Sequence, residues 1–236
     1  MKKTVVITMD IDWAPDEVVQ YAFDILNKYQ IKATIFMTHK MGVGHAPHEI
    51  GIHPNFTSID FEKHLVERLD DFPGIKGARS HSLLFSERFR PLYEKYNIEY
   101  DSNSMRYKQK NILPYLISPS VVEIPLFWMD NFCLEMEGDY PDYSIDTLDM
   151  ASEGIKLFNF HPVHVFLNTC SLSEYFSAKV DYHNAGKLQH HRNTKRNGTK
   201  DFLITLLEYI KSNNLEVKTL GEINQEFRKT HKIKTT

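Results

Sequence analysis

The chain has 236 residues, of which 42% are hydrophobic and 25% are charged, and its formal net charge at pH 7 is −3. These values are ordinary for a globular protein, favour one domain over residues 1–236, and argue against a mainly electrostatic nucleic-acid binder. No apolar run resembles a signal peptide or reaches membrane length, so we expect a cytoplasmic protein without a membrane span. Cys133 and Cys170 are far apart in the sequence and are expected to be reduced thiols.

The first predicted element is a buried strand that begins at Val5 and ends in two acids, Asp10 and Asp12. Because side chains alternate along a strand, both acids are expected to point the same way. Two carboxylates at the end of a buried strand are costly unless they bind something or react. The alternative is that Asp12 caps the helix that begins near Pro15, while Asp10 pairs with a base.

Strands and helices alternate along the rest of the chain. Strands are predicted over 33–38, 49–53, 75–79, 98–100, 121–125, 155–160 and 216–220, and helices over 16–29, 61–69, 86–96 and 201–213. This alternation predicts βαβ units and a parallel sheet, and the number of units predicts a closed or nearly closed barrel.

Two segments interrupt the alternation and are expected to be loop insertions. Residues 130–150 are acidic and rich in turn formers, which predicts a long loop over one rim. Residues 183–200 are basic and lack apolar periodicity. They are expected to form a solvated, mobile loop or, as the functional alternative, a lid that meets an anionic substrate.

Polar side chains follow seven of the predicted strands. In parallel barrels the carboxyl-terminal rim holds the active site, so we expect these side chains to share a site. The alternative is that these polar residues end the strands without sharing a role. One or two polar strand ends would fit that alternative, whereas seven favour a shared site. The candidate residues at or just after these ends are Asp10, Asp12, His39, His53, Asn55, Arg79, His81, Asp101, Asn103, Trp128, Asp130, His161 and His164.

Histidine nitrogens together with a carboxylate oxygen form a site suited to zinc or a similar divalent ion. A catalytic ion keeps three protein ligands and an open position for water, whose proton a free carboxylate can take. Asp10 and Asp12 could divide the roles of base and ligand. The sequence has neither a nucleophile elbow nor a phosphate-binding glycine loop, which leaves covalent and nucleotide-dependent mechanisms with little support.

Several of these segments, in this order, resemble the polysaccharide deacetylases with the NodB-homology fold. They are Thr8–Asp12, Ala33–Met37, Glu49–His53, the strand that carries Arg79, and Leu157–His161. Four segments resemble a divergent branch more narrowly, the WbmS-type deacetylase-like proteins of surface-polysaccharide gene clusters. They are Glu49–Phe56, Arg79–Leu83, Tyr100–Asn103 and Phe160–Asn168. The resemblance covers roughly residues 4–220 and implies a distorted or incomplete (β/α) barrel of about seven to eight parallel strands.

The resemblance also implies roles for individual residues. It makes Asp10 the catalytic base, Asp12 a metal ligand and His53 the first histidine ligand. The family's second histidine, four residues later, is replaced by Thr57. We expect His81 to supply the missing ligand, because strand alternation places it on the same face as Arg79; a satisfied rim histidine is the alternative.

Further roles follow from the same resemblance. Arg79 matches the arginine that orients the base, and a salt bridge at the barrel end is the alternative. His161 matches the general acid that protonates the leaving amine, a role that His164 could share. His39 and His164 are reserve metal ligands. The remaining candidates are expected to contact substrate or orient histidines, or else to be turn or core residues: His39, Asn55, Asp101, Asn103, Trp128 and Asp130.

The expected function is hydrolysis of an N-acetyl group from a sugar in lipopolysaccharide or capsule biosynthesis. The divalent ion would be zinc, and the substrate would be a nucleotide- or lipid-linked glycan precursor. Two alternatives remain open at this point. One is a deacetylase-fold protein that has lost catalysis and binds a glycan or a partner, which the replacement at Thr57 favours. The other is a deformylase that acts on an amino sugar.

Overall fold

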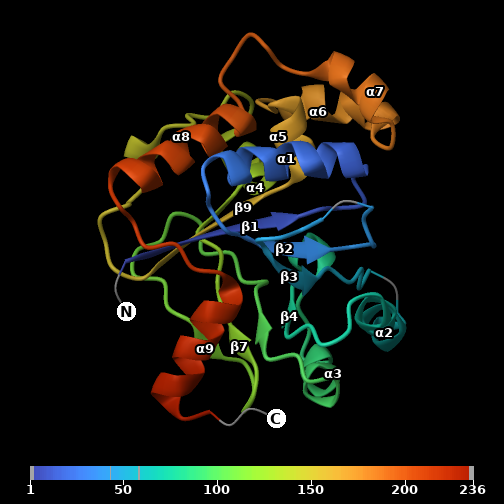
Figure 1. The fold of residues 1–236 in the computed structure, drawn as a ribbon, viewed down its shortest axis with the longest axis vertical. Coiled ribbons are helices and arrows are strands. Elements are labelled where there is room, and N and C mark those ends of the chain that lie inside the picture. Colours follow the sequence, from blue (N-terminus) through green and yellow to red (C-terminus); the bar gives the residue numbers. More distant parts are fainter. Residues whose placement is uncertain (1–2, 43, 58, 234–236) are drawn as a thin grey trace.

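The computed structural model of the protein describes residues 3–42, 44–57 and 59–233. Its centre is a curled sheet that forms a half-barrel with helices around it (Figure 1). Within the described residues, the strands are ordered β6-β7-β5-β4-β3-β2-β1-β9-β8, and all neighbours are parallel except β6 and β7. The predicted α/β class and the distorted or incomplete barrel of about seven to eight parallel strands are therefore confirmed.

The strands of the sheet differ greatly in length. The long ones, β1 and β9, pair with each other near one edge of the sheet, where β8 is the last strand. The strands are β1 (Thr4–Asp10), β2 (Thr34–Met37), β3 (Glu49–Ile52), β4 (Gly77–Ala78), β5 (Tyr100–Asp101), β6 (Tyr115–Leu116), β7 (Val122–Glu123), β8 (Trp128–Met129) and β9 (Ile155–Phe160).

Helices cover the sheet on both sides. In Figure 1, α1, α5 and α8 lie on one side of β1 and β9, while α9 and α3 lie toward the other. The helices are α1 (Asp16–Lys28), α2 (Phe61–Asp71), α3 (Phe89–Lys95), α4 (Asp130–Glu137), α5 (Pro162–Leu167), α6 (Leu172–Ala178), α7 (Ala185–Leu188), α8 (Thr199–Ser212) and α9 (Leu220–His231). The short 3-10 turns are η1 (His81–Leu83), η2 (Ile145–Thr147), η3 (Lys179–Asp181) and η4 (Gln189–His191). No described helix is long and apolar enough to cross a bilayer.

The side chains of β1 point alternately toward the apolar core and toward the interior of the half-barrel. Val5, Ile7 and Met9 belong to the large apolar cluster that also contains side chains of α1 and α8. Thr8 and Asp10 have the opposite parity and therefore face the inside of the curl. The strand is buried on both faces, so its inward polar groups must find partners within the protein.

The structure corrects three expectations. Residues 130–150, expected to be a loop, begin with α4, because the chain enters this helix at Asp130, directly after β8 ends at Met129. The expected loop 183–200 contains α7 and η4. The expected strand 216–220 makes only an isolated bridge between Val217 and Val5, and the chain turns into α9 at Leu220 under a capping box formed by Thr219 and Glu222. Cys133 and Cys170 are free and buried, as expected.

The close approach of β4 to β5 generates a stability prediction. A Cβ atom at Gly77 would lie 1.9 Å from Cζ of Tyr100, whose side chain is fully buried. We expect Gly77→Ala to lower the free energy of unfolding by about 1–3 kcal/mol, the usual cost of overpacking. Gly44→Ala, where nothing lies within 4 Å of the added atom, is the matched control. Urea denaturation of both variants measures the difference, and equal stabilities would contradict the prediction.

Candidate active site

Asp10 and Arg79 form a buried ion pair inside the half-barrel. Arg79 follows β4, is 0% exposed, and donates from Nη1 to Oδ1 of Asp10 at 2.9 Å. Asn159 of β9 donates from Nδ2 to the other oxygen of Asp10, also at 2.9 Å. Both carboxylate oxygens are therefore held, one by a cation and one by an amide, and the orientation of Asp10 is fixed.

The guanidinium of Arg79 is satisfied by several further groups. It donates to Thr8 Oγ1 at 2.9 Å and to Asn159 Oδ1 at 2.6 Å. Ser102 accepts at its carbonyl and its hydroxyl, each at 2.8 Å, and the ring of Phe36 lies 4.3 Å from the guanidinium carbon. A charge buried this deeply is tolerated because every side of it meets a partner.

Asp12 lies just beyond β1, in a turn with an unusual backbone. Its φ is 44° and that of Trp13 is 57°, both in the left-handed region that L-residues seldom adopt. The hydroxyl of Tyr182 donates to the carbonyl of Asp12 at 2.8 Å, and the amide of Trp13 donates to Thr38 Oγ1 at 3.0 Å. A second pair of left-handed residues, Ser82 and Leu83, follows His81 in the turn after β4.

Asp12 and His81, from these two turns, lie next to His53, which follows β3. Asp12 Oδ1 lies 3.0 Å from Nε2 of His53 and 3.2 Å from Nδ1 of His81. Burial alone would raise the pKa of the Asp12 carboxyl. Hydrogen bonds with His53 and His81 and the charge of His161 instead hold that pKa well below its ordinary value. The carboxylate of Asp12 is therefore ionised at neutral pH.

The geometry of this triad fits a divalent ion. Around a tetrahedral ion with ligand distances of about 2.0–2.1 Å, neighbouring ligand atoms lie about 3.3 Å apart. The 3.0 and 3.2 Å separations from Asp12 Oδ1 are close to that spacing. Within the described residues, Asp12, His53 and His81 form one of two groups whose donor atoms all lie within 4.8 Å of one another. Two imidazoles with one carboxylate are a donor set suited to zinc.

His161, which follows β9, lies next to both acids. Its Nε2 lies 3.6 Å from Oδ2 of Asp12 and 3.9 Å from Oδ2 of Asp10. Its Nδ1 lies 2.6 Å from Oδ1 of Asp130, and Oδ2 of Asp130 accepts from the backbone amide of His161 at 2.7 Å. Burial would lower the pKa of His161, but the carboxylates of Asp130, Asp12 and Asp10 raise it to about 10.

His164 lies next to His161, with the two ring centres 5.6 Å apart, but does not line the hollow. It faces Thr169 Oγ1 at 3.0 Å through Nδ1, and its ring packs on Tyr175. Burial lowers the pKa of His164 to about 4, so this imidazole is neutral at pH 7. Together with Asp130 and His161 it forms the second group of potential metal ligands among the described residues.

The other predicted site residues lie around this centre without lining its opening. His39 contacts Thr38, and Asn55 accepts from Thr57 in an exposed turn, which leaves Thr57 outside the ligand group. Trp128, 2% exposed, packs against Phe202 in the core and has no free face for a sugar.

Asp101 and Asn103 support the turn that carries His81. Asn103 donates from Nδ2 to Asp101 at 2.7 Å and accepts from the amide of Ser80 at 3.0 Å. Both residues are buried, and Asp101 carries a pKa well above its ordinary value because of burial and the nearby carboxyl of Glu123.

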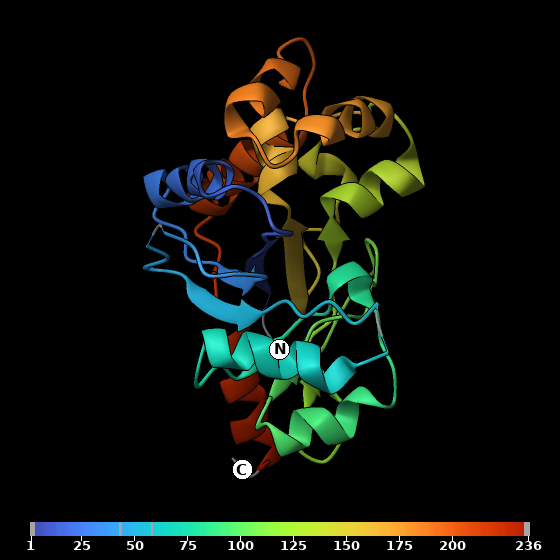
Figure 2. The ribbon, with the colours of Figure 1, turned by 90° about the vertical axis from the view of Figure 1, so that its right-hand side faces the viewer.

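A hollow of about 370 Å³ opens above the acids at the carboxyl ends of the strands. Figure 2 looks from the side toward which β1 and β2 point in Figure 1. The sequence predicted five of its lining residues; of the others, Asn131, Phe132 and Glu135 lie in a segment that was expected to be a loop. Asn159, which binds Asp10 but does not line the hollow, was not predicted because it lies inside a strand. The lining residues are Asp10, Asp12, His53, His81, Ser82, Leu83, Met129, Asn131, Phe132, Glu135 and His161.

Comparisons with known proteins agree with this architecture. The family model of WbmS-like polysaccharide deacetylases matches residues 7–179. The crystal structure of WbmS from Bordetella bronchiseptica, described as a polysaccharide deacetylase involved in O-antigen biosynthesis, superposes with a TM-score of 0.79 at 28% identity, covering 88% of this chain and 91% of that one. No curated protein sequence matches the chain.

A more distant structure shares the fold alone. A variant of a CE4-family pseudoenzyme from Bacillus anthracis, with restored enzymatic activity, superposes with a TM-score of 0.52 at 14% identity, covering 94% of this chain and 68% of that one. The half-barrel with acids and histidines at its carboxyl-terminal edge thus defines a deacetylase-type domain. The chain belongs to the WbmS-like polysaccharide deacetylase family, as its sequence motifs predicted.

The contact between His161 and Asp130 generates a titration prediction. In the metal-free protein, Asp130→Asn should lower the pKa of His161 from about 10 toward or below its ordinary value of about 6.5. NMR titration of the histidine ring measures the shift. Because the folded-state pKa is raised, Asp130 should stabilise the protein most below about pH 6.5, with the gain lost as the pH rises toward 10. The exposed Asp142→Asn is the control, and an unchanged His161 titration in Asp130→Asn would contradict the assignment.

Proposed function

We propose that the protein is a metal-dependent hydrolase that removes the acetyl group from an N-acetylated sugar of a surface-polysaccharide precursor. The observation that carries the proposal is the grouping of Asp12, His53 and His81 within reach of a fixed carboxylate, Asp10, and a cationic imidazole, His161. Membership of the deacetylase family supports the same reaction class.

Asp12, His53 and His81 would hold the divalent ion, which we propose to be zinc. When bound, such an ion polarises an acyl oxygen and lowers the pKa of water. The ionised Asp12 supplies the negative charge of the site, and its short contacts to both imidazoles hold the three donors together. His81 replaces the histidine that the family has at position 57.

Asp10 would act as the general base. Arg79 and Asn159 each bind one of its oxygens, so the carboxylate keeps its charge and its direction while it accepts a proton from water. Arg79 itself is buried beneath the acids and does not line the hollow, so its role is to position Asp10.

His161 would act as the general acid. With a pKa of about 10 its imidazole is protonated at neutral pH, and because Nδ1 donates to Asp130, Nε2 is left to donate to the substrate. Nε2 lies on the same side of the hollow as both acids, where a departing amine would need a proton. His164 is neutral and does not line the hollow, so we assign it to support of this region.

A metal-binding measurement tests the ligand set. Wild-type protein should retain about one equivalent of zinc after dialysis, and His81→Ala should weaken binding at least tenfold, since it removes one of three protein ligands. His45→Ala, an exposed histidine outside the ligand group, is the matched control. Wild-type protein that holds no zinc would contradict the metal site, and unchanged binding in His81→Ala would contradict the ligand assignment.

An activity measurement tests the reaction. Acetate release from N-acetylated amino sugars should fall by about 10²–10⁴ in Asp10→Asn, the range typical of a lost acid–base group, while zinc binding persists. Parallel assays with N-formylated sugars distinguish deacetylation from deformylation. A protein that binds zinc and glycans but releases neither acid from any of these substrates would favour the binding-protein alternative, which the replacement at Thr57 also supports.

A further inference from the structure

A second hollow of about 820 Å³ adjoins the candidate active site. Asp12 and His81 line both hollows, so a substrate seated at the first can extend into the second without leaving the protein. We call the second hollow the outer groove. It is lined by Asp12, Trp13, His81, Tyr175, Lys179, Val180, Tyr182 and His183.

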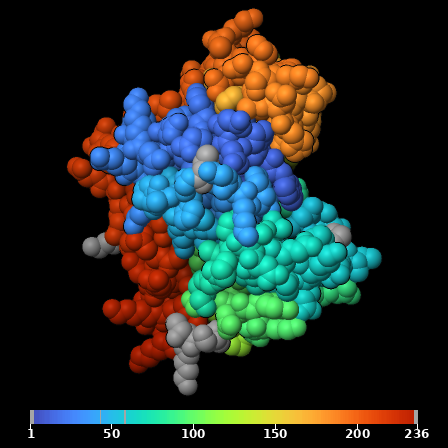
Figure 3. Space-filling model, turned by 45° about the vertical axis from the view of Figure 1, so that its right-hand side comes forward, coloured from blue at the N-terminus to red at the C-terminus, as the bar shows by residue number. Residues whose placement is uncertain are grey.

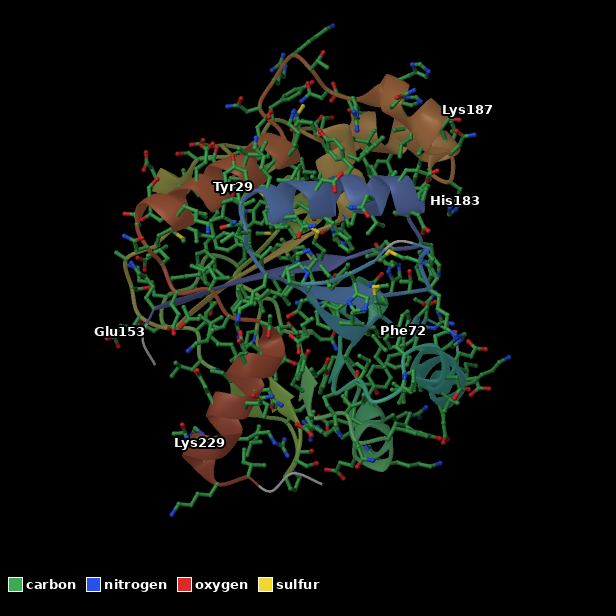
Figure 4. The ribbon with its side chains drawn as sticks, viewed as in Figure 1. Tyr29, Phe72, Glu153, His183, Lys187 and Lys229 are labelled. Atoms are coloured by element: carbon green, nitrogen blue, oxygen red, sulfur yellow. The ribbon has the colours of Figure 1, made fainter. Side chains whose placement is uncertain are left out.

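One wall of the outer groove is a projecting part of the chain, residues 171–197, which we call the arm. It comprises α6, η3, α7 and η4 and stands above the end of α1 in Figure 3. His183 and Lys187 mark it in Figure 4. The arm has five Lys and Arg residues against two Asp and Glu, whereas the whole chain is acidic at −3.

Contacts at two points of the arm fix its position relative to the candidate active site. The hydroxyl of Tyr182 binds the carbonyl of Asp12 at 2.8 Å. At the other end of the arm, the guanidinium of Arg192 lies 3.8 Å from the ring of Phe166 and 4.5 Å from that of Tyr21. The groove wall is therefore held in a defined position relative to the ligand Asp12.

The two hollows differ in charge. The inner one carries the carboxylates of Asp10, Asp12 and Glu135, whereas the outer groove carries that of Asp12 alone. The only Lys or Arg among the residues lining the outer groove is Lys179, whose Nζ lies 5.7 Å from the ring centres of Tyr175 and Phe176. Lys179 makes no ion pair with a carboxylate in the part of the chain that the structure describes, so its charge is available to a ligand.

The remaining lining of the outer groove is largely aromatic. Trp13, Tyr175 and Tyr182 line it, and Trp13 is 37% exposed. Aromatic rings with polar edges offer flat apolar faces and hydrogen-bonding groups together, which suits a sugar ring. A lysine ammonium beside them acts as a point charge for phosphate or carboxylate.

We propose that the outer groove binds an anionic group on the substrate, a phosphate ester or a carboxylate carried near the acetamido sugar, and that Lys179 is its cationic contact. This inference rests on the proposed function, because it takes the acetamido group to lie in the inner hollow. It defines the substrate class as anionic sugars and excludes neutral oligosaccharides as preferred substrates.

Calorimetric binding to the zinc-loaded protein tests this directly. The probes are an N-acetylhexosamine 1-phosphate, a nucleoside-diphosphate N-acetylhexosamine, an N-acetylated disaccharide with a uronic acid, and a neutral methyl glycoside. Lys179→Ala should weaken binding of the anionic probes about tenfold, which equals about 1.4 kcal/mol, and leave the neutral glycoside unchanged. Lys187→Ala, an exposed arm lysine outside the groove lining, should leave every affinity unchanged.

The pattern of losses decides between outcomes. Loss confined to the phosphate probes, or to the uronate, supports the proposal and identifies the anion. Equal loss for the neutral glycoside, or wild-type binding without preference for anions, overturns it. Acetate release by the wild type is measured on the same probes. Lys179-dependent binding without any release would mean that the proposed reaction is wrong, whereas release without anion preference would mean that the groove assignment is wrong.

Discussion

The buried pair of Arg79 and Asp10 is the interaction on which the rest of the structure depends. An incomplete barrel has no hydrogen-bonded closure between its edge strands, and here a polar network spans its interior instead. Arg79 follows β4, Asp10 ends β1, Asn159 belongs to β9, and Ser102 follows β5. Removing Asp10 or Arg79 would leave a buried charge without its ion-pair partner, so the network holds the curvature and the carboxylate of Asp10 with the same contacts.

This arrangement separates two kinds of acid that are close in sequence. Both acids line the hollow, but the side chain of Asp10 is 3% exposed and held by an arginine and an amide, while that of Asp12 is 20% exposed and meets imidazoles. The separation arises because β1 ends at Asp10 and the chain then turns through left-handed backbone at Asp12 and Trp13. One acid is suited to accept a proton and the other to bind a cation, although both come from the same strand end.

Much of this could be predicted from the sequence, because hydrophobic periodicity and polar strand ends are local signals. The grouping of Asp12, His53 and His81 followed from strand alternation and family motifs. The arm and α4 could not be predicted in the same way, since their segments have short, polar helices that are stabilised by contacts made elsewhere in the fold. Trp128 shows what a local signal does not reveal. Its place at a predicted strand end suggested a sugar contact, but its side chain is buried because it packs against Phe202 of α8, which is distant in the sequence.

The paired left-handed turns have a consequence for how the rim could evolve. Trp13 and Leu83 adopt backbone angles that glycine would accept without strain, yet both are bulky. Each presents its side chain to one hollow, Trp13 to the outer groove and Leu83 to the inner hollow. Replacement by glycine would remove the backbone strain of the turn, but it would also remove a side chain that lines a hollow. At these two positions, a less strained backbone and the present shape of the binding surface are therefore mutually exclusive.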